Sequence, residues 1–242
     1  MLFFYVLVEG CTWNIASKLA TNSYAHKSTI YRRYIKWLDC GIFKQTYDEI
    51  LNKYLTDRTI DEVHIDSTDI QNKNMSTKHT YKSFKLGKQA LRLTVLGDNL
   101  RAPIDYRIDK ALEPDSVLGY NILINTKLRF KTNTFVFGDK GYQMKDVKRK
   151  NILDINKLRI VVPKRRYKKK NKYKTKNYKS KRKIIRHSRR MKEGLSRRIV
   201  IEHINSNLHR SYKRIDKVHD KSIKTFDGFV KLTCSMILIN KL

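Results

Sequence analysis

The hydrophobic pattern changes its period once, near residue 57, and this change limits the possible folds more than any other feature of the chain. From Trp13 to Leu55 apolar residues recur at helical spacing. After Asp57 they alternate with period two, in the segments EVHIDST, SFKLGK, ALRLTVLGDN and DNLRAPIDYRI. Successive strands followed by alternating helices and strands predict an α/β fold, with a mixed sheet flanked by helices.

The rest of the chain continues this alternation. A helix is predicted in DSVLGYNILINTKL, a strand in NTFVFGDK, a helix in GYQMKDVKRKN and a strand in LRIVVP. One long helix is predicted in MKEGLSRRIVIEHINSNLHRSYKRIDKV, and an apolar helix in KTFDGFVKLTCSMILINKL closes the chain. We therefore expect a small helical region over residues 1–57 and an α/β domain over residues 58–242.

The opening segment MLFFYVLVEG is apolar but has neither the basic start nor the small-residue cleavage site of a secretory signal. It is also too short to cross a bilayer, which takes about 20 apolar residues. We expect it to be the end of a buried helix whose beginning is missing.

Two short helices, NIASKLA and STIYRRYIKWLDCG, are predicted on either side of a turn through Asn22 and Ser23. Ser28 is expected to cap the second helix and Gly41 to end it. The basic residues expected near its exposed face are Arg32, Arg33 and Lys36. The residues expected to pack inward are Tyr34, Trp37 and Leu38. A DNA-binding helix-turn-helix and an ordinary helical hairpin with a solvated basic face fit this pattern equally well.

Charge indicates the partner. The 242 residues carry 54 Lys+Arg against 22 Asp+Glu, a formal net charge of +32. Nucleic acid is the usual partner of so basic a chain. An A/T-rich coding sequence would increase the number of lysines but would not explain the many arginines. The three cysteines, Cys11, Cys40 and Cys234, are far apart and indicate a reducing compartment without structural zinc.

The segment from Lys164 to Arg190, called the basic arm below, has Lys or Arg at over half its positions, with tyrosines interleaved. Such a segment can follow a phosphate backbone and stack its tyrosines on bases. It can equally be a solvated, partly disordered loop. The candidate DNA contacts in it are Arg165, Arg166, Lys168, Lys169 and Lys170.

Three acidic residues stand in separate segments that suit a metal site. Asp66 lies in VHIDSTD, Asp139 in FVFGDKGY and Glu202 in RRIVIEHIN, where helical spacing predicts apolar neighbours beside the glutamate. The first two belong to strands, at whose ends ligands gather in α/β sheets, and the third belongs to a helix laid against the sheet. Each acid alone has an ordinary explanation: an Asx turn, a glycine turn, and a helix pair of Glu202 with Arg198. Together they predict carboxylates converging on a pair of Mg²⁺ ions.

These stretches resemble a DDE transposase of the bacterial insertion-sequence type, whose catalytic domain has the ribonuclease-H-like fold. The matching segments are VHIDSTDIQ, GKQALRLTVLGDNLRAP, FVFGDKGYQ and RRIVIEHINSNLHRSYKRIDKVHDK, and FFYVLVEGCTWNIASKL with STIYRRYIKWLDCGIF resembles the amino-terminal region. Arg198 and Glu202 fill their family positions. Leu195 stands where the family often has tyrosine, and His209 stands where lysine is usual, with Arg210 beside it. These departures affect the expected contacts to the cleaved strand.

The resemblance implies metal-dependent DNA strand cleavage and strand transfer at the ends of a mobile element. Asp66, Asp139 and Glu202 would be the catalytic triad and would bind Mg²⁺, with two ions expected and Mn²⁺ as a substitute. The partners would be double-stranded DNA, from element ends and target, and a second copy of the chain in a homodimer. Further candidate DNA contacts are Lys140, Arg198, His209 and Arg210. The location would be intracellular with the DNA, in a bacterial cytoplasm or a eukaryotic nucleus, and not in a membrane.

Three other functions are considered. A tyrosine recombinase would use His187-x-x-Arg190 and Tyr212, but that short pattern arises by chance in basic segments and leaves the three acids unexplained. A domesticated or decayed transposase would only bind DNA. A ribonuclease-H-like nuclease or junction resolvase would cut DNA without joining 3′-hydroxyl ends to a target.

Overall fold

The computed structural model describes residues 2–19, 26–56, 58–163 and 188–242. The predicted turn through Asn22 and Ser23 lies outside the described residues. So does most of the basic arm, including the candidate contacts Arg165, Arg166, Lys168, Lys169 and Lys170, and also His187.

A mixed β-sheet forms the centre of the molecule. Its strands are β1 (Glu62–Asn72), β2 (Tyr81–Lys82), β3 (Gln89–Asp98), β4 (Pro103–Lys110), β5 (Thr134–Phe137), β6 (Leu158–Val161) and β7 (Lys217–Val218). β3 pairs antiparallel with β1, β4 and β2, whereas β5 pairs parallel with β1 and β6 pairs parallel with β5. β7 adds a short parallel pairing to the end of β1. The predicted α/β class, with a mixed sheet flanked by helices, is confirmed.

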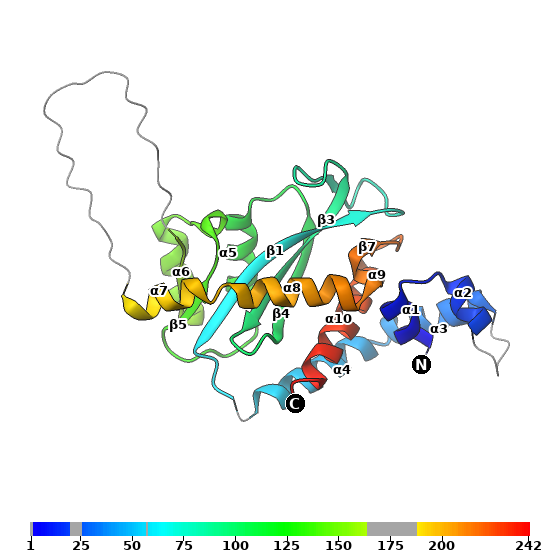
Figure 1. Cartoon of the computed structure of the whole chain (residues 1–242), viewed down its shortest axis with the longest axis horizontal. Helices are drawn as coiled ribbons and strands as arrows, with labels where there is room; N and C mark the ends of the chain where they lie inside the picture. Colours follow the sequence, from blue (N-terminus) through cyan, green and yellow to red (C-terminus); the bar gives the residue numbers. More distant parts are fainter. Residues whose placement is uncertain (1, 20–25, 57, 164–187) are drawn as a thin grey trace, which may run out of the picture.

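Helices cover both faces of this sheet (Figure 1). They are α1 (Leu2–Glu9), α2 (Trp13–Leu19), α3 (Lys27–Asp39), α4 (Ile42–Leu55), α5 (Asp115–Asn125), the 3₁₀ helix η1 (Lys140–Tyr142), α6 (Asp146–Asn156), α7 (Arg189–Ser196), α8 (Ile199–Ser211), α9 (Lys213–Asp216) and α10 (Ile223–Ile239). α8 packs on β1 and β3, and α10 packs on β4 and α4. α5 packs against β3 and β4 from the opposite face.

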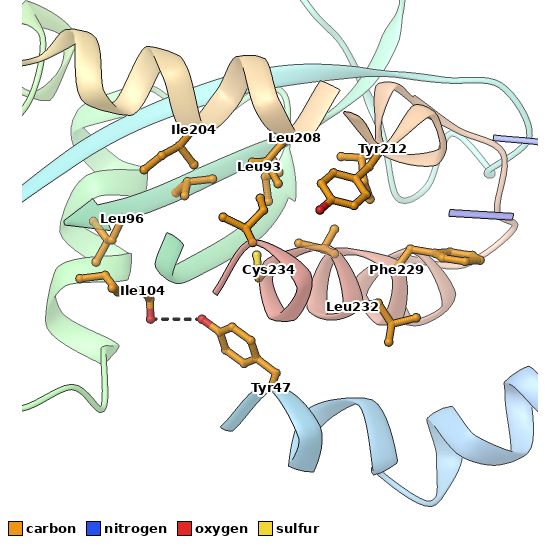
Figure 2. Packing of buried hydrophobic residues seen from close by; sticks show 14 of the residues in the cluster. Tyr47, Leu93, Leu96, Ile104, Ile204, Leu208, Tyr212, Phe229, Leu232 and Cys234 are labelled. Atoms are coloured by element: carbon orange, nitrogen blue, oxygen red, sulfur yellow. Dashed lines mark hydrogen bonds between the residues drawn. The ribbon is translucent and has the colours of Figure 1, made fainter. Parts of the chain in front are cut away.

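The core joins these layers. Leu93 of β3 lies between Leu208 of α8 and Cys234 of α10, and Tyr47 of α4 donates a hydrogen bond of 3.1 Å to the carbonyl of Ile104 (Figure 2). The amino-terminal helices contribute to the same buried cluster. Because both parts share one core, the division into residues 1–57 and 58–242 stays a prediction about function.

A glycine on β3 allows α8 to approach the sheet closely. A Cβ atom at Gly97 would collide with Cδ1 of Ile204 and lie 3.2 Å from Cδ1 of Ile201. Gly97 pairs with His64 of β1, so this close contact lies near the end of β3 and the start of β1. A larger residue at position 97 would have to displace α8 or its side chains.

The amino-terminal helices follow the prediction with two exceptions. The opening segment is a helix, and its Phe3, Val6 and Leu7 are buried. In α3, Tyr34 is fully buried, but Trp37 is 40% exposed, so its predicted inward position is wrong. The Trp37 ring meets the rings of Phe3 and Phe43 edge-on and leaves its other side to solvent. The predicted cap is also wrong: α3 begins at Lys27, and its N-cap is His26, two residues before Ser28, with His26 Nδ1 accepting a hydrogen bond from the Ser28 backbone.

Two further predictions are corrected. SFKLGK is a turn and not a strand, because Gly87 takes a positive φ of 63° and Ser83 Oγ accepts a hydrogen bond from the Leu86 backbone. The single long helix predicted near the carboxyl end is divided into α7, α8 and α9, and it breaks at Tyr212, whose ψ of 81° is not helical. No helix in the part of the chain described here is long and apolar enough to cross a membrane.

Candidate active site

α8 lies along β1 in a regular register. Arg197, just before α8, donates to Glu62 of β1 at 2.5 Å, Asn205 Nδ2 donates to Asp66 Oδ2 at 3.0 Å, and His209 Nε2 lies 3.1 Å from Thr68 Oγ1. Four residues of a helix rise about 6 Å and two residues of a strand about 6.6 Å. Every fourth residue of α8 can therefore contact every second residue of β1. Asp66 therefore faces α8, whereas its neighbour Ser67 faces the other side and bonds Tyr142.

Asp66 and Asp139 come together because their strands are parallel neighbours. The last paired residues are His64 of β1 and Phe137 of β5, and each acid stands two residues further on. Burial raises the pKa of Asp66, and the charge of Asp139 raises that pKa further. The Ser67 backbone, Lys85 and Arg198 act in the opposite direction. The charge of Asp139 thus acts on Asp66 at this place on the sheet.

Asp139 also closes the turn that follows β5. Its Oδ1 accepts a hydrogen bond of 2.6 Å from the Gly141 backbone, so the glycine turn considered from sequence is present. A Cβ atom at Gly141 would lie 2.6 Å from Oδ2 of Asp115 and 2.8 Å from Oδ1 of Asp139. Only glycine fits between these acids. Burial raises the pKa of Asp115, Arg92 and Lys85 lower it, and Asp139 raises it.

Glu202 stands on the same side of α8 as Asn205, one helical turn earlier. Its side chain is 56% exposed and accepts from Arg198 Nη2 at 3.3 Å, which is the helix pair considered from sequence. The charge of Arg198 also lowers the pKa of Asp66, so Arg198 interacts with both Glu202 and Asp66. Among the described residues, Glu202 makes neither a hydrogen bond nor an ion pair to Asp66 or Asp139. The predicted apolar environment of Glu202 is wrong, since both Ile199 and Glu202 are exposed.

The oxygen atoms around Asp66 suit a hard cation in chemical type. Asp66 and Asp139 supply carboxylates, and Oδ1 of Asn205 is buried without a hydrogen-bond partner among the described residues. Magnesium takes such oxygen ligands. However, no three His, Cys, Asp or Glu side chains within the described ranges are grouped closely enough to hold a metal ion. Two of the predicted ligands are therefore adjacent, and Glu202 would have to turn toward them.

A family model described as a transposase DDE domain matches residues 57–238. This chain belongs to that family. No curated protein and no solved structure matches the chain. The match spans the whole sheet of the transposase, from β1 to β7, and the three acids.

The candidate DNA contacts of the transposase fall in different places. Arg32, Arg33 and Lys36 are exposed on α3, Lys140 follows Asp139, and Arg210 is exposed near the end of α8. His209 is largely buried between Thr68 and Asp216, whose oxygen lies 3.5 Å away. Burial lowers the pKa of His209 below its usual value despite Asp216. At neutral pH the imidazole is therefore mostly uncharged, unlike the lysine usual there.

The buried state of Tyr212 argues against a tyrosine recombinase. Only 6% of Tyr212 is exposed, and burial raises the pKa of its hydroxyl. A nucleophilic tyrosine needs access to DNA and an activated hydroxyl. The environment of Tyr212 in this transposase opposes both requirements.

Sequence reasoning missed Asn205 and Asp115 as parts of the site. Helical spacing places Asn205 near the inner side of its helix. It assigns Asn205 no role, because an isolated Asn gives no indication of its hydrogen-bond partner. Asp115 looks like an ordinary acidic residue in the first turn of α5. Its proximity to Asp139 arises only when η1 folds back over α5.

Proposed function

We propose that this transposase cuts DNA at the ends of a mobile element and joins the freed ends to target DNA, with Asp66, Asp139 and Glu202 as its catalytic carboxylates. The observation that carries the proposal is the adjacent position of Asp66 and Asp139 on parallel strands, where Asp139 raises the pKa of Asp66. The two carboxylates repel each other, and a bound cation would offset that repulsion. Membership of the transposase family supports the same function.

Each side chain of the site would have a separate role. Divalent ions held there, Mg²⁺ or Mn²⁺, would supply activation of a water molecule and stabilisation of charge on the leaving oxygen. Asp66 and Asp139 would bind them, Asn205 would orient Asp66, and Glu202 would complete the set by leaving Arg198. Arg198, released from Glu202, would then be free to contact the DNA phosphate.

The reaction would proceed in two steps at one site. The water oxygen would bond to phosphorus while the bond to the 3′-oxygen breaks, which leaves a 3′-hydroxyl and a 5′-phosphate. The 3′-hydroxyl oxygen would then bond to the phosphorus of a target phosphodiester, and the 3′-oxygen of the target strand would leave. Such chemistry depends on positioning and charge neutralisation, so no histidine base is needed. Double-stranded DNA would be the partner, with a homodimer pairing two ends and an intracellular location.

The test uses labelled duplex containing the DNA that borders the reading frame, with a supercoiled target plasmid and Mg²⁺. Asp139→Asn should lose both cleavage and joining while its DNA affinity stays within about twofold of wild type. Asp154→Asn, at an exposed position on α6, is the matched control and should keep full activity. Cleavage by Asp139→Asn near the wild-type rate would remove Asp139 from the site.

The same assay separates the alternative functions. Cleavage without joined products would indicate a nuclease or resolvase. DNA binding without cleavage by the wild-type chain, at any Mg²⁺ or Mn²⁺ concentration, would indicate a chain that only binds DNA.

A further inference from the structure

Two basic pockets lie on the surface, one beside α8 and the other beside the segments that lead into β1 and β5. The first has a volume of about 360 Å³, and its basic lining residues are Arg101, His203, Arg210 and Lys241. The second has a volume of about 570 Å³, and its basic lining residues are Arg58, Lys127, Arg129 and Lys131. Among the residues that the structure describes, no acidic side chain lines either pocket.

A hydrogen bond joins the two pockets. Arg58 of the second pocket donates from Nη2 to the carbonyl of Lys241, in the first pocket, at 2.9 Å. The guanidinium of Arg58 also lies 4.1 Å from the centre of the Tyr54 ring, which fixes its position. The pockets are therefore adjoining parts of one basic surface, called the basic track below.

Most cations of the basic track have no counter-charge. Arg101, Arg210, Lys127, Arg129 and Lys241 make no ion pair within the described part of the chain. Lys131 lies 3.5 Å from Asp61, at the surface. Uncompensated cations at close range repel one another and collect counterions, whose release drives binding to a phosphate backbone.

The second pocket is separated from Asp139. Lys131 precedes the first residue of β5, whereas Asp139 follows the last, so this pocket and Asp139 lie at opposite ends of the strand. The first pocket is lined by residues of α8 that follow Glu202, from His203 to Ser211. The hydroxyl groups of Ser206 and Ser211 and the amide of Asn207 add polar groups to the first pocket. Hydroxyl, amide and cationic groups together are the usual contacts of a sugar–phosphate backbone.

We propose that the basic track binds the sugar–phosphate backbone of duplex DNA, with the second pocket at a distance from the phosphate that reacts. The proposal rests on the proposed function only in taking DNA as the partner. Its tests measure binding in EDTA, so they are independent of cleavage and of the three acids.

The first test compares two triple variants by fluorescence anisotropy, with a random-sequence duplex of about 30 base pairs across a salt series. Lys127→Gln, Arg129→Gln and Lys241→Gln together remove three exposed cations from the track. The control, Lys78→Gln, Lys110→Gln and Lys150→Gln, removes three exposed cations from elsewhere. The slope of log affinity against log salt should fall by about 0.9 for each phosphate that the track variant no longer neutralises, and remain nearly unchanged in the control. Equal slopes for both variants would overturn the proposal.

The second test uses the unmodified protein. Acetylation of lysines, followed by mass spectrometry, should show Lys127 and Lys241 protected by the duplex, and Lys78, Lys110 and Lys150 modified as in free protein. Protection of all five lysines, or of none, would refute a specific track. Equal protection of Lys127 and Lys241 by inorganic phosphate at the same phosphate concentration would mean a small-anion site instead.

Discussion

At the scale of single residues, Glu62, His64 and Arg197 form a cluster that joins the start of β1 to the residue just before α8, and Arg197 is partly exposed in it. The His64 ring is fully buried, and its Nε2 lies 2.9 Å from Glu62. Burial raises the pKa of Glu62, but hydrogen bonds from His64 and Arg197 outweigh it and lower the pKa to about 2. The ionised carboxylate is thus favoured by the folded state over the unfolded chain.

Glu62→Gln should therefore lower the free energy of unfolding at pH 7, by up to about 3 kcal/mol. Because the folded pKa lies below the ordinary value of 4.5, this stabilisation is complete above that pH and disappears as the pH falls toward 2. Urea denaturation at several pH values measures the difference between the proteins. Asp48→Asn, which breaks only the exposed pair with Lys44, should change stability by less than about 0.5 kcal/mol. A difference for Glu62→Gln that is equal at pH 7 and pH 3 would contradict the pKa argument.

Glu193 is a matched control for substitutions of Glu202. Glu202 pairs with Arg198, and Glu193 pairs with Arg189, each four residues apart on an exposed helical face. Both Glu→Gln substitutions should leave the free energy of unfolding within about 0.5 kcal/mol. Only Glu202→Gln should abolish DNA cleavage, as measured with the labelled duplex. If the two variants cut DNA equally well, Glu202 is a structural surface residue and not a member of the triad.

At the scale of elements, the sequence predicted β1, β3, β4, β5 and β6 and the helices that flank them. It missed the two-residue strands β2 and β7, which are too short to carry an alternation of apolar residues, and it placed Lys217 and Val218 of β7 in a helix. It predicted α8 less well. The actual buried side includes Val200, Ile201, Ile204, Asn205 and Leu208, and a polar Asn on this side obscured the helical phase. Neither the break at Tyr212 nor the proximity of Asp115 to Asp139 has a local signal. Both depend on contacts with elements far away in the sequence.

The position of α8 relative to the sheet depends on the missing side chain of Gly97. Gly97→Ala should destabilise the fold by about 1–3 kcal/mol, because the new methyl group meets Ile204. It should also slow DNA cleavage, since α8 carries Asn205 and Glu202. Adding Ile204→Val removes the colliding Cδ1 and should restore part of both properties. Chemical denaturation and cleavage rates on the two single variants and the double variant give the coupling, and strictly additive losses would exclude this collision as the cause.

At the scale of the whole molecule, the amino-terminal helices and the sheet share one core. The ring of Tyr34 stacks on Phe229 of α10 at 4.7 Å, and its hydroxyl donates to the carbonyl of Thr225 at 2.8 Å. A Cβ atom at Gly228 would lie 2.5 Å from that hydroxyl. The last helix of the chain is thus in direct contact with a helix from its beginning.

We therefore expect a single cooperative unfolding transition. Both tryptophans, Trp13 and Trp37, lie in the amino-terminal helices, so tryptophan fluorescence reports on that region and on the contact of Trp13 with Phe229 of α10. Circular dichroism reports on the whole chain, and the two transitions should coincide. Tyr34→Phe should shift both equally, by about 1 kcal/mol, through loss of one buried hydrogen bond. A fluorescence transition that precedes the change in circular dichroism would show that residues 1–57 unfold separately.

The alignment of α8 with β1 sets a limit on the length of that helix. Each matched step differs by about 0.6 Å between helix and strand, so a mismatch of about 2 Å accumulates over three steps, well beyond the roughly 0.5 Å range of hydrogen-bond lengths. The helix ends at Ser211, just after its contact at His209, and the chain then pairs with β1 as the strand β7. A helix and a strand that rise by unequal amounts per matched step can keep their paired contacts only over a few steps. Beyond that length, this chain continues beside β1 as a strand instead of a helix.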